Sequence, residues 1–285
     1  MRPMTRREAL QASGVLALAG LAGCSGTESA AATSDAETAA GGSARGSAGS
    51  SAEGLPTPFV VPQSTIPVLG RDEVFPVRRI YCIGRNYAAH AIEMGSDPTR
   101  EPPFFFQKPT DAIQLAWPGE VLDHSYPPLT RNYHYEVELV VALRGGGRDI
   151  SPDEALDRVY GYAVGLDMTR RDLQLASRAE EKPWEIGKSF DNSAVLGPLH
   201  HVADVGHFHA GRIRLSVNGE VKQEADLEQM IWNVAEQISQ LSQGSELRPG
   251  DIIYSGTPEN VGPVVVGDLM EGHIDGLTDI AVRVV

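Results

Sequence analysis

Cysteine is nearly absent from this 285-residue sequence, which contains only Cys24 and Cys82. If Cys24 is lipidated, as its context indicates below, no intrachain disulfide is possible. Cys82 follows Ile80 and Tyr81 and precedes Ile83. This apolar setting predicts a buried thiol within a strand and argues against a reactive nucleophile.

Positive charge is also scarce, because 24 Lys and Arg stand against 38 Asp and Glu, for a net charge of −14. The acidic residues are spread through the chain, so we interpret them as solubilising rather than as a binding tail. A charge of this sign argues against nucleic acid or anionic lipid as a partner. The sequence also lacks a G-x-G-x-x-G motif after a strand, a P-loop and any repeat of fixed period.

No apolar run near the N-terminus is long enough to span a membrane, since the stretch 9–23 is short and only moderately apolar. It follows the pair Arg6 and Arg7, as in a twin-arginine signal, and ends in Leu-Ala-Gly before Cys24, as in a bacterial lipobox. We therefore expect residues 1–23 to direct export and Cys24 to carry a lipid anchor. The protein would then be periplasmic, or a membrane-anchored lipoprotein facing the periplasm or cell exterior. The alternatives are a plain cleaved signal and a chance N-terminal sequence.

The next segment, residues 24–54, consists almost entirely of Ser, Ala, Gly, Thr and Glu and has no aromatic residue. This composition predicts a disordered tether. Residues 55–285 then suffice for a single domain with an ample core. Within it, residues 59–75 are expected to be extended, because Pro62 and Pro67 exclude a helix there.

Strand-like segments outnumber helical ones in the folded region. Strands are expected at 77–84, 102–109, 135–142, 160–167, 213–218 and 220–223, and as short pieces in 262–285. Helices are expected at 85–95, 153–159, 168–179 and 226–241, and a loop with a strand edge at 183–191. The dipeptide Asn218-Gly219 predicts a tight hairpin turn. Because helices and strands do not alternate regularly, we expect an α+β fold that is predominantly mixed β.

Two carboxylates share one face of the expected strand 135–142. Glu136 and Glu138 are two residues apart, so on a strand they point the same way. Two adjacent carboxylates repel one another unless a cation lies between them, and a hard divalent metal ion is the usual one. The alternative is a solvated strand face. A second cluster, formed by the four histidines between residues 200 and 209, lies in a Gly-containing stretch that favours a surface loop over a metal site.

The motifs of the folded region occur in an order that resembles the fumarylacetoacetate hydrolase family, in particular its acylpyruvase and oxaloacetate decarboxylase branch. The motifs are Gly84-Arg85-Asn86-Tyr87 with His90 and Glu93, then Glu136-x-Glu138, Leu166-Asp167-Met168-Thr169, Gly187-Lys188-Ser189-Phe190-Asp191 and Ser255-Gly256-Thr257-Pro258. The likeness covers nearly all of the chain after the tether. It implies the family's β-sandwich or roll with a few short helices, and a homodimer.

The resemblance also assigns roles to single residues. It implies that Glu136, Glu138 and Asp167 bind Mg²⁺ or Mn²⁺, a choice that fits an all-oxygen ligand set. It implies that His90, oriented by Glu93, activates water, and that Lys188 stabilises developing negative charge. The residues that it places around the substrate are Arg85, Lys108, Arg171, Gln174 and Thr257. Whether Lys108 touches the substrate or supports the site is left open.

The implied reaction is cleavage of a C–C bond beside a carbonyl in a small 2-oxo or 2,4-dioxo acid, together with oxaloacetate decarboxylation. The dyad favours hydrolysis. Two alternatives stay open: an isomerase or hydratase that acts on a dicarboxylic catabolic intermediate, and a catalytically weak lipoprotein that binds 2-oxo acids. One departure from the family pattern is Asn260, where glycine is common; asparagine tolerates left-handed backbone angles better than other non-glycine residues.

Overall fold

The computed structural model describes residues 58–95, 97–99 and 101–285. The expected signal (1–23) and tether (24–54) lie outside these residues, so the export signal and the lipid anchor at Cys24 stay predictions. Residues Phe59–Val285 form one compact unit. Within the described part of the chain, no helix has the length and apolar character needed to cross a membrane.

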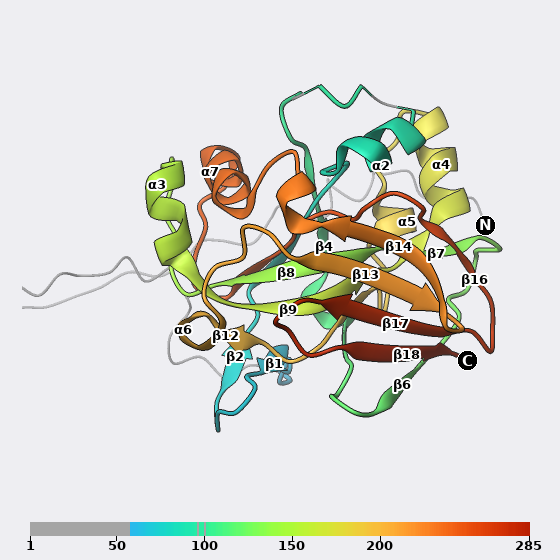
Figure 1. Ribbon diagram of the computed structural model, residues 1–285, viewed down its shortest axis with the longest axis horizontal. Coiled ribbons are helices and arrows are strands. Elements are labelled where there is room, and N and C mark those ends of the chain that lie inside the picture. Colours follow the sequence, from blue (N-terminus) through green and yellow to red (C-terminus); the bar gives the residue numbers. More distant parts are fainter. Residues whose placement is uncertain (1–57, 96, 100) are drawn as a thin grey trace, which may run out of the picture. The chain divides into compact units, whose positions relative to one another are not determined.

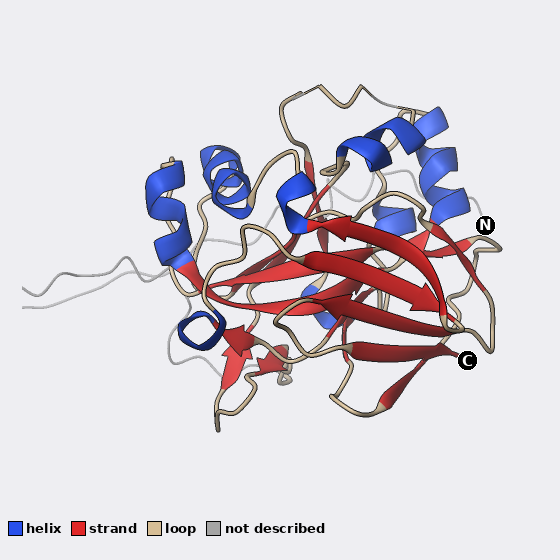
Figure 2. Cartoon of the chain, viewed as in Figure 1, coloured by secondary structure: helices blue, strands red, loops and turns tan. Residues whose placement is uncertain are grey.

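An eight-stranded mixed sheet forms the centre of this unit (Figures 1 and 2). Its order is β4-β3-β15-β8-β9-β11-β5, with β12 paired to β9. Most neighbours are antiparallel, but β15 with β3 and β11 with β5 are parallel. The strands are β3 (Arg79–Ile83), β4 (Phe105–Lys108), β5 (Ile113–Leu115), β8 (Val137–Leu143), β9 (Val159–Asp167), β11 (Ala194–Leu196), β12 (His200–His201) and β15 (Asp251–Tyr254).

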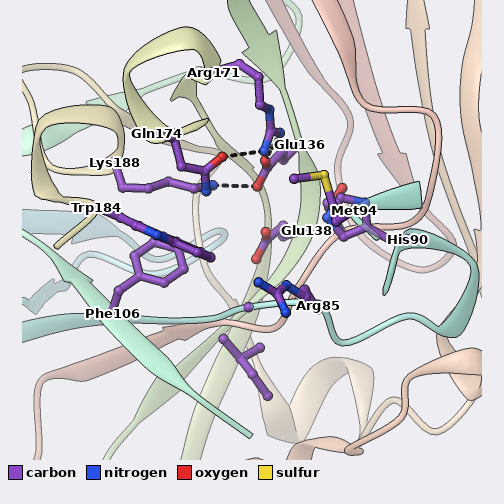
Figure 3. A pocket seen from close by; sticks show the side chains of 13 residues that line it. Arg85, His90, Met94, Phe106, Glu136, Glu138, Arg171, Gln174, Trp184 and Lys188 are labelled. Carbon is purple, nitrogen blue, oxygen red and sulfur yellow. Dashed lines mark hydrogen bonds and ion pairs between the residues drawn. The ribbon is translucent and has the colours of Figure 1, made fainter. Parts of the chain in front are cut away.

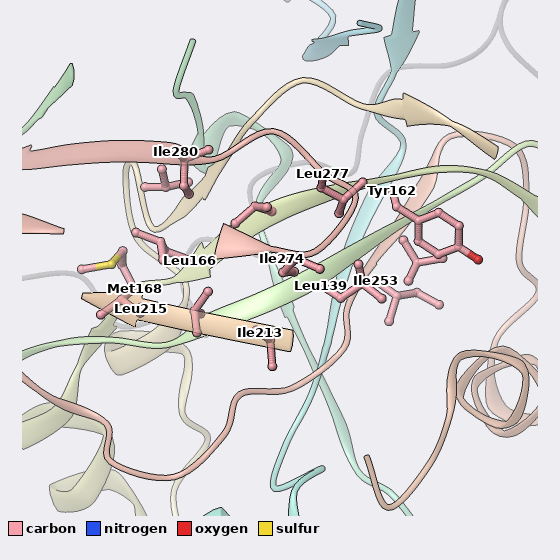
Figure 4. Close-up of a cluster of buried hydrophobic side chains, with 14 of the residues drawn as sticks. Leu139, Tyr162, Leu166, Met168, Ile213, Leu215, Ile253, Ile274, Leu277 and Ile280 are labelled. Carbon is pink, nitrogen blue, oxygen red and sulfur yellow. The ribbon is translucent and has the colours of Figure 1, made fainter. Parts of the chain in front are cut away.

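A five-stranded sheet of order β14-β13-β17-β18-β6 packs on one face of the central sheet. Figure 4 shows Leu139 and Leu166 of the central sheet among Ile213, Leu215 and Ile274 of the second sheet. The second sheet contains β6 (Val121–His124), β13 (Arg212–Val217), β14 (Glu220–Asp226), β17 (Leu269–Ile274) and β18 (Ile280–Val284). The expected sandwich of mainly mixed β structure is therefore confirmed.

Two small sheets complete the β structure. The order β10-β7-β16 joins β10 (Thr169–Arg170), β7 (Tyr133–Tyr135) and β16 (Gly262–Val264). The second pairs β1 (Thr65–Pro67) with β2 (Val74–Pro76). The predicted hairpin is confirmed between β13 and β14, because Asn218 and Gly219 have φ angles of 53° and 79°, as a type I′ turn requires.

Strand β8 is buried on both faces. Val137, Leu139 and Val141 face the core between the two sheets, and Val140 and Ala142 face a second core beneath β1 and β2. Glu138 therefore points to the same side as Val140. The second core also contains Cys82, whose pKa is raised well above its ordinary value by burial, as expected for an unreactive thiol.

The helices are short and gather at opposite ends of the sheets, with α2, α4 and α5 at one end and α3 and α7 at the other (Figure 1). The helices are α2 (Ala88–Glu93), α3 (Pro152–Ala155), α4 (Arg171–Ala179), α5 (Glu185–Lys188), α6 (Val202–Val205) and α7 (Val234–Gly244). Single 3₁₀ turns occur at Thr110–Ala112, Leu156–Arg158 and Leu227–Gln229.

Two of the sequence predictions for this region are wrong. The expected helix 226–241 is interrupted: Asp226 caps a 3₁₀ turn, and a second cap at Asn233 starts α7. The interruption exists because Asn86 bonds both the N–H and the carbonyl of Trp232, which holds that backbone away from helical geometry. The expected loop and strand edge at 183–191 contains the one-turn helix α5, which packs against α4.

We expect His124 to make the free energy of unfolding depend on pH. Burial lowers its pKa to about 4, and its ring bonds Gln114 Oε1 and Tyr133 Oη, each at 2.6 Å. The unfolded chain, with an ordinary pKa near 6.5, binds this proton first, so stability is complete above pH 6.5 and is lost as the pH falls toward 4. We expect this residue to remove about 2 kcal/mol from the free energy of unfolding between pH 7 and pH 5.

The measurement is denaturant unfolding of the wild type and of His124→Gln at both pH values. Because other carboxyl groups titrate in both proteins, the difference between their pH dependences isolates His124. Equal slopes for the two proteins would contradict the prediction.

Candidate active site

Three carboxylates lie close together, at the start of β8 and the end of β9. Glu136 lies between β7 and β8, Glu138 is the second residue of β8, and Asp167 is the last residue of β9. The pairing of β8 with β9 and a hydrogen bond from Asp167 N to the Glu136 carbonyl (2.9 Å) hold them together. One oxygen of each lies within 4.8 Å of the others, and all three side chains are buried. Burial excludes the solvated strand face.

Three cations form ion pairs with Glu136 and Asp167, and Figure 3 shows two of them, Lys188 and Arg171, beside Glu136. Lys188 Nζ lies 2.7 Å from Glu136 Oε2 and 2.8 Å from Asp167 Oδ2, and it also contacts Thr169 Oγ1. Lys108 Nζ lies 2.8 Å from Asp167 Oδ1. Arg171 forms an ion pair with Glu136 through Nη2.

The surroundings of Glu136 and Glu138 shift the pKa values of these two carboxylates in opposite directions. Burial alone would raise the pKa of Glu136, but Lys188 and Arg171 outweigh it and hold this pKa well below its ordinary value. Glu138 has no such partner: burial, followed by the like charges of Asp167 and Glu136, raises its pKa well above the ordinary value. A further positive charge beside Glu138 would relieve this repulsion.

The donor set fits a hard divalent cation. All three residues offer carboxylate oxygens, which suit Mg²⁺ or Mn²⁺ better than zinc. Asp167 Oδ1 is buried, and its contact with Lys108 Nζ is an ion pair without the alignment of a hydrogen bond, so this oxygen accepts no hydrogen bond from any described residue. Within the part of the chain that the structure describes, this is the only His, Cys, Asp and Glu group with metal-site geometry. The histidines between residues 200 and 209 do not form one; His200 and His201 form β12, and His201 caps α6.

A His–Glu pair faces the carboxylates from helix α2. His90 Nδ1 lies 2.9 Å from Glu93 Oε2, as their spacing of three residues on a helix predicts. Glu93 Oε1 also accepts a hydrogen bond from Asn260 N at 3.1 Å. Asn260 adopts the expected left-handed conformation, with φ of 65°. The Glu93 contact leaves Nε2 of His90 without a hydrogen-bond partner among the described residues.

Most of these groups line one open cavity (Figure 3). The predicted site residues that line it are Arg85, His90, Glu136, Glu138, Arg171, Gln174, Lys188 and Thr257. Glu93, Lys108 and Asp167 stand behind them. Lys108 is almost fully buried and donates to the carbonyls of Met168 and Lys188, so the structure places it in a supporting position. Ile83, Met94, Phe106 and Trp184 supply an apolar wall that the sequence did not indicate.

Gln223 is a further contributor that sequence reasoning missed. It lies on β14 in the second sheet and is fully buried. Its Nε2 donates to Thr257 Oγ1 and Pro258 O, both at 2.9 Å, and its Oε1 accepts from Val137 N at 3.1 Å. Gln223 therefore joins the Thr257 turn to the backbone between the two glutamates. No local motif marks it, because its partners are far away in the sequence.

We expect Gln223→Met to lower the free energy of unfolding by about 2–4 kcal/mol, because it leaves buried backbone groups without partners. Affinity for Mn²⁺ should also fall, since Val137 is the neighbour of both glutamates. Denaturant unfolding and Mn²⁺ titration measure the two effects. Gln243→Met, at an exposed position of α7, is the matched control. Wild-type values for Gln223→Met would refute the positioning role.

Known proteins are similar to this chain in sequence and in fold. The family model "Fumarylacetoacetate (FAA) hydrolase C-terminal" matches residues 79–285. A fumarylpyruvate hydrolase from a Ralstonia species is 44% identical over 188 residues, which cover 66% of this chain and 95% of that protein. A mitochondrial oxaloacetate decarboxylase from Dictyostelium discoideum is 37% identical over 203 residues, covering 70% and 90% of the two chains.

A solved structure of a similar protein has the same fold. The fumarylpyruvate hydrolase from Pseudomonas aeruginosa, crystallised with Mn²⁺ and pyruvate, is 54% identical and superimposes with a TM-score of 0.80, covering 81% of this chain and 99% of that one. Together, the matching family model, the relatives and the shared fold show that this chain belongs to the fumarylacetoacetate hydrolase family.

Proposed function

We propose that the protein is a divalent-metal-dependent hydrolase that releases pyruvate from acylpyruvates. The observation that carries this proposal is the His90–Glu93 pair facing the three buried carboxylates across one cavity. A water-activating base beside a metal site is what hydrolysis of a C–C bond requires and what simple 2-oxo acid binding does not. The fumarylpyruvate hydrolases among the relatives support the same reaction.

Different residues of the cavity would bind the substrate carboxylate and the metal ion. Arg171 and Gln174, bonded to one another at 2.6 Å, present N–H groups beside Glu136 and would bind the carboxylate of the pyruvoyl part. Glu136, Glu138 and Asp167 would hold Mg²⁺ or Mn²⁺, and the bound ion supplies electrophilic polarisation of the 2-oxo group. We propose Mn²⁺ or Mg²⁺ equally, because an all-carboxylate set suits both.

His90 would act as the general base that takes a proton from water. With Nδ1 held by Glu93, its free Nε2 would take a proton from water as the water attacks the acyl carbonyl. The bond between that carbonyl carbon and the pyruvoyl methylene then breaks, and its electron pair moves to the pyruvoyl part as an enolate. Lys188 lies within the same cavity and would stabilise that negative charge. Protonation of the enolate carbon gives pyruvate, and the acyl group leaves as a carboxylic acid.

The direct test is pyruvate release from acetylpyruvate and fumarylpyruvate by the purified protein with Mn²⁺, with Mg²⁺ and with a chelator. We expect turnover with either metal and its loss with the chelator. Absence of pyruvate from both substrates in the presence of both metals would overturn the proposal.

A second candidate is decarboxylation of oxaloacetate, which the Dictyostelium relative favours. Loss of CO₂ from oxaloacetate leaves the same pyruvate enolate, so the same charge-stabilising groups would serve it without attack by water. The same pyruvate assay with oxaloacetate as the substrate measures this activity. Rates no higher than the metal-catalysed background would exclude it.

We also propose that the protein is exported through its twin-arginine signal, anchored by lipid at Cys24, and dimeric. The Arg6-Arg7 pair and the following Leu-Ala-Gly-Cys sequence support export and anchoring. A reporter fused to residues 1–54 should reach the periplasm, and replacing both arginines by lysine should stop its transport. Light scattering of the purified domain tests the dimer.

A further inference from the structure

Arg85 has an uncommon backbone conformation at the edge of the cavity. It follows β3 and Gly84, lines the cavity, and has a φ of 57°. A left-handed conformation costs a residue with a side chain about 1–2 kcal/mol. Strain of this kind persists where the surrounding structure enforces it, and it is concentrated at functional sites. In Figure 3, Arg85 lies on the opposite side of Glu138 from Arg171 and Gln174.

Two aromatic rings lie beside the Arg85 guanidinium. Its centre lies 5.2 Å from the ring centroid of Phe104 and 5.9 Å from that of Trp184, and the two rings meet edge to face. Gly84 makes this arrangement possible, because a Cβ there would lie 2.0 Å from Phe104 Cζ. Contacts with aromatic rings do not use up the N–H donors of a guanidinium. Nε of Arg85 is buried and has no hydrogen-bond partner among the described residues.

Arg85 is also the uncompensated cation of the site. Lys108, Lys188 and Arg171 are each ion-paired with one or more of the three carboxylates. Arg85 forms no ion pair with any residue that the structure describes. The pKa of Arg85 is lowered by burial and by Arg178, although Glu101 opposes this shift. With a divalent cation bound, the site would therefore carry positive charge beyond that needed by one substrate carboxylate.

We propose that Arg85 binds a terminal carboxylate on the acyl part of the substrate and thereby selects dianionic 2,4-dioxo acids over acylpyruvates with a neutral acyl group. This inference rests on the proposed hydrolase function. The pyruvoyl carboxylate lies at the Arg171 end, and the acyl group extends past Glu138 toward Arg85 along Phe106 and Trp184. The N–H donors of Arg85 then form the paired hydrogen bonds that a carboxylate accepts. The second product is a dicarboxylic acid.

The first test compares kcat/KM for fumarylpyruvate, which has a terminal carboxylate, with that for acetylpyruvate, which has a methyl group there. We expect the wild type to prefer fumarylpyruvate, and we expect Arg85→Gln to reduce that preference about 10–100-fold, because kcat/KM falls more for fumarylpyruvate than for acetylpyruvate. Arg85→Lys keeps the charge without the paired geometry and should recover only part of the preference. Arg178→Gln removes a nearby positive charge that lies outside this cavity and should leave the preference unchanged.

A second test needs no turnover. Fumarate and crotonate differ only by a carboxylate in place of a methyl group, and calorimetry on the Mn²⁺-loaded protein measures the binding of each. We expect fumarate to bind more tightly to the wild type, and Arg85→Gln to abolish the difference. The inference is overturned if the two acids bind alike, or if Arg85→Gln lowers kcat/KM equally for both acylpyruvates. No pyruvate from either substrate, with the fumarate preference intact, would instead overturn the hydrolase function alone.

Discussion

Glu138→Gln is expected to lower kcat/KM for acylpyruvate hydrolysis by at least about 10²-fold, since replacing groups that merely support metal ligands already costs 10–100-fold. The amide has nearly the shape of the carboxylate and still offers an oxygen to Gly256 N, which lies 2.7 Å from Glu138 Oε2. The loss therefore reports the missing charge and not a collapsed turn. Turnover assays at several Mn²⁺ concentrations measure it.

The same substitution should not destabilise the metal-free protein. Burial and the charges of Asp167 and Glu136 raise the pKa of Glu138, so the ionised side chain opposes folding at neutral pH. Glutamine removes that repulsion. We therefore expect the Tm of the metal-free variant to equal or exceed that of the wild type, while the increase in Tm caused by Mn²⁺ disappears. Glu271→Gln, on an exposed position of β17, is the control. If Glu138→Gln kept full activity, or if Mn²⁺ raised its Tm as much as it raises that of the wild type, Glu138 would not be a metal ligand.

Local pattern was sufficient to predict the strands and the glutamate pair. The alternation around Val137, Leu139 and Val141 indicates a strand in any context, and it sets the direction in which Glu136 and Glu138 point. Pattern alone left their role open, since a solvated face has the same sequence. The deciding facts are tertiary: burial of both side chains, and the arrival of Asp167 from the neighbouring strand.

The predictions failed where distant residues control local structure. The apolar stripe from Met230 to Leu241 resembles one helix, but Asn86 takes the backbone groups of Trp232 and so delays the start of α7 until Val234. Gln223 gave no signal for the same reason, because it acts from another sheet on the Thr257 turn. Neither contact has a local periodicity, so single-sequence reasoning cannot find it.

His90→Gln is expected to separate the two reactions proposed for this site. Removal of a positioned general base typically costs 10²–10⁴-fold, so hydrolysis of acylpyruvates should fall by about that factor. Decarboxylation of oxaloacetate needs no activated water, and we expect it to change much less, by under about 10-fold. Parallel assays of pyruvate release from both substrates, with the same Mn²⁺ concentration, measure the two effects. His209→Gln, in an exposed loop, controls for loss of an imidazole elsewhere.

Glu93→Gln tests the role of His90 as general base in a second way, because Glu93 contacts His90 and does not line the cavity in which the substrate would lie. An amide can still accept a hydrogen bond from His90 Nδ1, but it no longer stabilises the positive imidazole that forms as water loses its proton. Hydrolysis should therefore fall by less than in His90→Gln, again with decarboxylation largely retained. If His90→Gln lowered both reactions equally, His90 would be a substrate-binding group. In that case water activation would have to come from elsewhere in the cavity, where the remaining ionisable groups are cations or the carboxylates assigned to the metal.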